Sequence, residues 1–92
     1  MADSQNRRLQ DRVLVDLIEA DVDMAFGLVD DATDEFRDGN QLYAQRALED
    51  ARRALADIES RLSELGPDRR SPFGPLVDEL RKSINQAQSE CG

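Results

Sequence analysis

Apolar residues between Ala44 and Leu65 recur with spacings that alternate between four and three residues. This is the heptad repeat of a helix that packs along a neighbouring helix. The positions of this heptad seam are Ala44, Leu48, Ala51, Leu55, Ile58, Leu62 and Leu65. They cover an arc of about 120° on a helical wheel, which is typical of a helix with one solvated side. The pattern therefore predicts a second helix over residues 40–65.

The segment before the seam, residues 4–38, contains no proline and has a much wider apolar face. Its apolar residues cover an arc of about 200°, well beyond that of a simple surface helix. Because a face this wide contacts two neighbours, the segment is predicted to be a long central helix. Its only glycine, Gly27, lies on the polar side, where it costs about 1 kcal/mol relative to alanine and marks a candidate bend.

Glycine and proline mark the ends of the predicted helices. Gly39 suits the left-handed residue after a helix, and Asn40 suits the N-cap of the next one. Pro67 ends the second helix, because proline cannot continue it. After a short loop, Ser71 is a candidate N-cap for a third helix over residues 72–89.

Two short connections imply antiparallel neighbours. The sequence therefore predicts an all-α fold, an up-down-up three-helix bundle that forms a single domain over residues 1–92. From the rise per residue of a helix, the first helix is roughly 50 Å long and the second is under ~40 Å. The part of the first helix around Leu9 to Val15 is therefore expected to overhang the hairpin.

Surplus apolar residues on the first helix require cover, which a second copy of the chain would supply. The candidate interface residues are Leu9, Val13, Val15, Val22, Phe26 and Val29. The last four form a stripe on one flank of the wide apolar arc. The hypothesis predicts a homodimer that associates through the first helix. The alternative is that the third helix covers this stripe within a single chain.

Asp21 is a polar residue near the middle of that apolar arc. A buried carboxylate needs a partner, and an Arg side chain or the hydroxyl of Ser83 would serve. One interpretation is a ligand contact or a group that fixes the helix register. The other is a hydrated carboxylate at the rim between two helix contacts, since isolated buried Asp is rare.

The chain is acidic, with a formal net charge of −8 from 20 Asp and Glu against 12 Lys and Arg. Such a field repels nucleic acid and anionic membranes, so neither is an expected partner. Carboxylates crowd the C-terminal end of the first helix, where the helix dipole disfavours them. They are Asp30, Asp31, Asp34, Glu35 and Asp38. They form either a site for a basic partner or a divalent cation, or a solvated face neutralised by Arg37 and Arg46.

The residue types on which most catalysis depends are missing. With no His, the chain lacks the commonest general base and the commonest metal ligand. The single cysteine, Cys91, cannot build a structural zinc site, and no glycine-rich phosphate loop occurs. We therefore expect a protein that is not an enzyme and holds no cofactor or metal. The lone cysteine, and the lack of a signal-peptide core or a long apolar run, favour the cytoplasm.

Six small and large packing residues in the middle of the chain form a second pattern besides the heptad seam. They are Leu28, Ala32, Gly39, Ala44, Leu48 and Ala51. With this spacing, residues 25–56 resemble a single tetratricopeptide-type helical hairpin. The family usually has apolar or aromatic residues where this chain has Asp31 and Glu35, and a helix-ending proline where it has Ala56. No second repeat follows. The resemblance implies a scaffold that binds other proteins.

These observations favour a non-enzymatic protein-interaction or regulatory module that self-associates through its first helix. The alternative is an acidic binding protein whose carboxylate-rich face engages a basic partner or a divalent cation. A third hypothesis is a small carboxylate-based metal protein. Salt dependence separates the first two, because a complex through an acidic face weakens with ionic strength and an apolar interface does not.

Overall fold

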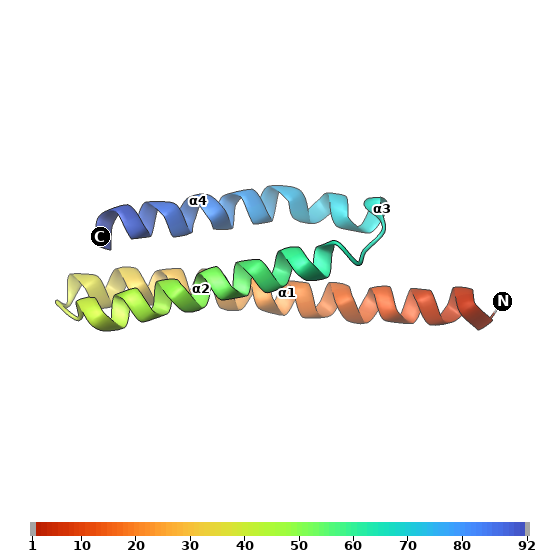
Figure 1. The fold of residues 1–92 in the computed structure, drawn as a ribbon, viewed down its shortest axis with the longest axis horizontal. Coiled ribbons are helices and arrows are strands. Elements are labelled where there is room, and N and C mark those ends of the chain that lie inside the picture. The colour runs from red at the N-terminus through yellow and green to blue at the C-terminus, as the bar shows by residue number, and fades with distance from the viewer. Residues whose placement is uncertain (1, 92) are drawn as a thin grey trace.

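A computed structural model describes the backbone of residues 2–91 and the side chains of residues 10–90. Three long helices run up, down and up: α1 (Ala2–Arg37), α2 (Gln41–Leu62) and α4 (Gly74–Cys91) (Figure 1). A short helix, α3 (Pro67–Arg70), and a 3₁₀ turn, η1 (Ser71–Phe73), connect α2 to α4. The predicted all-α, up-down-up three-helix bundle with a long first helix is confirmed.

The core lies where the three long helices meet. Its largest fully buried side chains are Ile18, Ile58 and Leu80, one from each of α1, α2 and α4. Burial of an aliphatic side chain of this size contributes about 1.5–3 kcal/mol. Within residues 10–90 no polar or charged residue is buried, so the core is held by apolar packing alone.

The heptad seam of α2 is buried almost as predicted. Leu55 is half-buried, Ala54 joins the core, and the other six seam residues are buried. The contact between α1 and α2 is the most extensive in the fold. Both helices carry fully buried alanines seven residues apart, namely Ala25 and Ala32 on α1 and Ala44 and Ala51 on α2. Small side chains at these positions let the two helices pack closely near the hairpin tip.

A Schellman motif joins α1 to α2. Gly39 has a φ of 87°, in the left-handed region that favours glycine, as predicted. The Gly39 N–H donates to the Phe36 carbonyl at 3.1 Å, and the Asn40 N–H donates to the Glu35 carbonyl at 2.8 Å. Asn40 occupies the predicted N-cap position, but its side chain does not cap α2. Its Nδ2 instead donates to Glu35 Oε2 at 2.7 Å, which ties the turn back to α1.

α2 ends at Leu62, earlier than the predicted end at Leu65. The N–H groups of Glu64 and Leu65 donate to the carbonyls of Arg61 and Leu62 at 3.0 and 3.1 Å. These bonds to the third preceding residue tighten the end of the helix. Leu65 is still buried, so the apolar spacing extends past the last α-helical turn.

The connection before α4 is helical rather than the predicted loop. Pro67 starts α3, at a position where the N–H that proline lacks has no partner within the helix. Ser71 has a φ of −52° and a ψ of −43°, both helical values. The predicted N-cap at Ser71 is therefore wrong, because the chain is already helical from Pro67 onward. α4 begins at Gly74 rather than at residue 72.

The N-terminal end of α1 extends beyond the turn formed by α3 (Figure 1). α1 has 36 residues and α2 has 22, so the longer helix overhangs the hairpin. The overhang is shorter than predicted, because the bundle reaches back as far as Asp11. Its Oδ2 lies 3.7 Å from Arg69 Nε of α3, and Leu14 packs against the core. α1 continues as one helix through Gly27.

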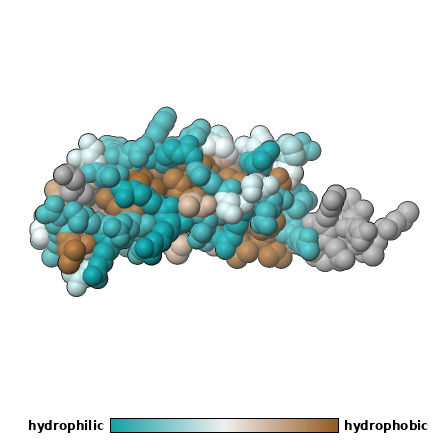
Figure 2. Space-filling model, in the orientation of Figure 1, coloured by the Kyte–Doolittle hydropathy of each residue, from teal (hydrophilic) through white to brown (hydrophobic). Residues whose placement is uncertain are grey.

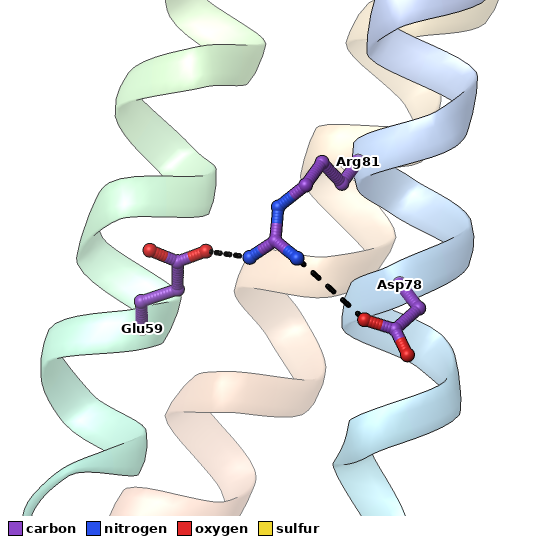
Figure 3. Close-up of polar contacts among 3 residues, drawn as sticks. All are labelled: Glu59, Asp78 and Arg81. Carbon is purple, nitrogen blue, oxygen red and sulfur yellow. Dashed lines mark hydrogen bonds and ion pairs between the residues drawn. The ribbon is translucent and has the colours of Figure 1, made fainter.

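Ion pairs connect the long helices at the rims of the bundle. Arg81 on α4 pairs with Glu59 on α2, and its other terminal nitrogen lies 3.6 Å from Asp78 Oδ1 (Figure 3). Arg61 on α2 pairs with Asp21 on α1. Partly exposed pairs of this kind contribute about 1 kcal/mol or less each.

Candidate protein-interaction surface

An apolar row on α1 is exposed to solvent on the side away from the core. We call it the outer stripe and define it as Val13, Leu17, Ala20 and Met24. Val13, Leu17 and Met24 are 57%, 43% and 54% exposed, and Ala20 is also exposed. Figure 2 shows a hydrophobic patch at the lower edge of the molecule, on the α1 side of the bundle and toward its α3 end. The spacing is that of a heptad repeat, so the four side chains share one face of the helix.

Different residues border the outer stripe on its two sides. On one side lie two exposed aspartates, and a third continues the same row, at intervals of seven, beyond Met24. We call these three the acidic border: Asp16, Asp23 and Asp30. On the other side lie three half-buried residues, also at intervals of seven: Leu14, Asp21 and Leu28. This second side faces α2, since Asp21 pairs with Arg61 there. The open side of the stripe is therefore the acidic one.

The structure corrects the predicted interface on α1. Val22 and Val29 belong to the core, with 4% and 7% of their surface exposed, and Val15 and Phe26 are half-buried against it. This flank is covered within one chain because α1 packs against both α2 and α4. That the chain itself covers this flank is the alternative to a homodimer interface. Of the predicted interface residues whose side chains are described, only Val13 lies on the exposed side.

Leu17, Ala20 and Met24 are surface residues that are not predicted as such from the sequence. The signal that could have found them is the heptad spacing that they share with Val13. It is hidden because the wide apolar arc of α1 holds two rows at once, one buried and one exposed. Leu9, the remaining predicted interface residue, lies outside the side chains that the structure describes.

The net charge of the chain is concentrated on α1. Between Val13 and Phe36 the sequence contains acids but no Lys or Arg. The acids are Asp16, Glu19, Asp21, Asp23, Asp30, Asp31, Asp34 and Glu35. The remaining 12 acids equal the 12 Lys and Arg in number, so this stretch accounts for the whole net charge of −8. Of these acids, Asp21 alone takes part in an ion pair within residues 10–90.

The predicted acidic face at the end of α1 remains largely solvated. Its exposed members are Asp30, Asp31, Asp34 and Asp38. Glu35 is half-buried and accepts the hydrogen bond from Asn40. In the part of the chain with described side chains, neither Arg37 nor Arg46 pairs with any of them. No group of three or more metal-ligating residues there is arranged to hold a metal ion.

Asp21 has an Arg partner, one of the two predicted kinds. Its side chain is 19% exposed and that of Arg61 is 35% exposed, so the pair lies at the rim between α1 and α2. This agrees with the interpretation of Asp21 as a carboxylate between two helix contacts. Because Arg61 lies on α2, the pair links α1 to α2.

A second group of exposed apolar residues lies at the hairpin tip. Leu42 and Tyr43 are each 63% exposed, and Phe36 is 38% exposed. A shallow depression beside them is lined by residues 39–43 and Gln45. Leu42 and Tyr43 are adjacent in α2 and so point in different directions. The tip therefore offers no continuous apolar row to a partner helix.

Comparisons with protein-family models, curated proteins and solved structures find no match to this chain. The tetratricopeptide-like resemblance of residues 25–56 stays a prediction. Among the described residues, no helix has an apolar stretch that would cross a bilayer. The outer stripe with its acidic border is the surface feature on which a functional argument can be built.

Proposed function

We propose that this protein is a non-enzymatic protein-interaction module and that the outer stripe of α1 is its binding surface. One observation carries the proposal: the bundle buries one apolar row of α1 and leaves a second one in water. Val13 and Met24 are more than half exposed although they lie on the same helix as the fully buried Ile18. Contiguous exposed apolar surface of this kind marks interaction sites in soluble proteins.

The residue composition supports a role without catalysis. The chain has no His and a single Cys, so the commonest general base and the commonest metal ligand are absent. A lone cysteine also suits a reducing compartment, and we place the protein in the cytoplasm.

The occupant of the outer stripe is either a second copy of the chain, as in the predicted homodimer, or a different protein. The alternative function, an acidic binding protein, is predicted on a different set of carboxylates at the C-terminal end of α1, of which only Asp30 belongs to the acidic border. A partner bound to the outer stripe would contact its apolar side chains and the carboxylates of the acidic border at the same time.

Site-specific cross-linking tests this function. A chain with benzoylphenylalanine in place of Ala20 is irradiated in extract of its own cells, and the control carries the same group in place of Arg53, an exposed residue of α2. We expect discrete adducts from position 20, lost when Leu17→Gln and Met24→Gln are added. An adduct with a second copy of the chain and an adduct with another protein both support the proposed function. No adduct from position 20, or the same adducts from both positions, contradicts the proposal.

A further inference from the structure

The outer stripe and the acidic border have the arrangement of one half of a two-helix coiled coil. In heptad notation Leu17 and Met24 are a positions, and Val13 and Ala20 are d positions. The acidic border then falls on g positions, which flank the seam and select the partner through charge. The structure leaves both seam and border exposed.

A heptad seam is matched along its length by another helix. Side chains at a and d positions of a partner helix insert between those of the stripe, whereas a strand or loop has a different repeat. The stripe covers about three turns, so a single helix of similar length covers it. The occupant is therefore expected to be an amphipathic helix.

The charges decide which helix this is. A second copy of α1 would place its own g-position aspartates beside the acidic border in an antiparallel pair. In a parallel pair it would place Asp21, Leu28 and Glu35 there, the residues at e positions. Neither orientation supplies a cation, and each copy brings the acidic stretch that carries the net charge of −8. Like charges placed together across an interface are destabilising.

We infer that the outer stripe binds a basic amphipathic helix of another protein, with apolar residues on its seam and Lys or Arg at the flanking positions. This inference rests on the proposed function, because it names the occupant of the same surface. The cations of the partner helix meet Asp16, Asp23 and Asp30, and its apolar residues cover Leu17 and Met24. The acidic border speeds association and rejects acidic helices, while the stripe provides the apolar contact.

A synthetic peptide of about 20 residues is the probe, long enough to cover the stripe as a helix. It has Leu at a and d positions and Lys at e and g positions, and it carries a fluorophore for anisotropy measurements. The control peptide has Glu in place of every Lys. We expect the Lys peptide to bind the full chain with a micromolar Kd and the Glu peptide to bind at least about tenfold more weakly. Raising the salt from about 50 to about 300 mM should weaken the Lys peptide several-fold.

Paired variants locate the binding. Leu17→Gln with Met24→Gln should weaken the Lys peptide about tenfold or more, whereas Leu42→Gln at the tip should leave its Kd unchanged. The double variant Asp16→Asn/Asp23→Asn should weaken binding of the Lys peptide at least about threefold more than the double variant Asp50→Asn/Asp57→Asn does. The second double variant is the control, because it removes the same charge from α2. All these residues are exposed, so circular dichroism and thermal melts should confirm that each variant folds.

Three results would overturn this inference. The first is an equal loss of affinity for the Lys peptide in the two aspartate double variants, which would show that the peptide is attracted to the total charge alone. The second is no loss from Leu17→Gln with Met24→Gln. The third is a dimer of the wild-type chain, seen by light scattering, that these same two substitutions dissociate. That third result would leave the proposed function intact, and the cross-linking experiment would then give adducts between two copies.

Discussion

The inner and outer faces of α1 carry apolar residues in the same heptad spacing over nearly the same length of helix. The inner row is Ile18, Val22, Ala25, Val29 and Ala32, and all five residues are buried. The outer stripe has four apolar residues, and all of them are exposed. The two rows differ in what lies beside them, because an aspartate row borders only the outer one. The heptad spacing of a row predicts that it packs against another helix, and we propose that the bordering charges select the partner of the exposed row.

The largest expected difference between the faces comes from truncating one aliphatic residue on each. Ile18→Ala removes a fully buried side chain and should lower the free energy of unfolding by about 2–5 kcal/mol. Leu17→Ala, on the adjacent residue, should lower it by less than about 1 kcal/mol, because the side chain is 43% exposed. Urea unfolding followed by circular dichroism measures both. Equal losses would mean that the outer stripe is packed inside the bundle.

Enlarging an alanine on each face gives the next largest effect. Ala25→Leu places a larger side chain in the close α1–α2 contact and should destabilise the fold by about 1–3 kcal/mol. Ala20→Leu extends the outer stripe into solvent and should leave the unfolding free energy nearly unchanged. The comparison uses the same unfolding experiment. A stable Ala25→Leu variant would show that the contact between α1 and α2 is looser than its buried alanines imply.

The Asp21–Arg61 pair lies between the two faces and should have an intermediate value. A double-mutant cycle of Asp21→Asn and Arg61→Gln should give a coupling free energy of about 1 kcal/mol or less, since both side chains are partly exposed. The coupling should shrink as salt is added. A coupling of zero at low salt would remove the pair as a restraint on helix register.

The smallest effect concerns Gly27, which lies on the solvated side of α1. An added Cβ there meets nothing within 4 Å, and the residue is helical. Gly27→Ala should therefore stabilise the fold by about 0.5–1 kcal/mol. Gly39→Ala is the control and should destabilise it, because Gly39 has a φ of 87°. A loss of stability in Gly27→Ala would point to a packing role that the bundle does not show.

The sequence predicts α2 well because its apolar arc is narrow. With one row of apolar residues, only one face can be buried, and the positions from Ala44 to Leu62 follow directly from the spacing. The glycine turn is equally predictable, since Gly39 adopts the left-handed backbone that the pattern requires. The helical turns from Pro67 to Phe73 are less predictable from the sequence, because a proline can both end one helix and start the next, as Pro67 does between α2 and α3.

The wide arc of α1 could not be divided from the sequence alone. α4 has two sides of the α1–α2 hairpin on which to pack, and apolar spacing does not say which one it takes. α4 takes the side on which Val22 and Val29 are buried, and the opposite flank with Leu17 and Met24 stays exposed.

The most direct test of this two-faced helix is the solvent exposure of the Met24 methyl group. The chain is labelled at its methionine methyl groups, Met24 is assigned by comparison with Met24→Leu, and a soluble paramagnetic agent is added while NMR relaxation is recorded. We predict strong relaxation at Met24 at low and at high protein concentration, and protection only when the Lys peptide is present. Protection at low protein concentration without peptide would contradict the account, because it would place the outer stripe inside the bundle.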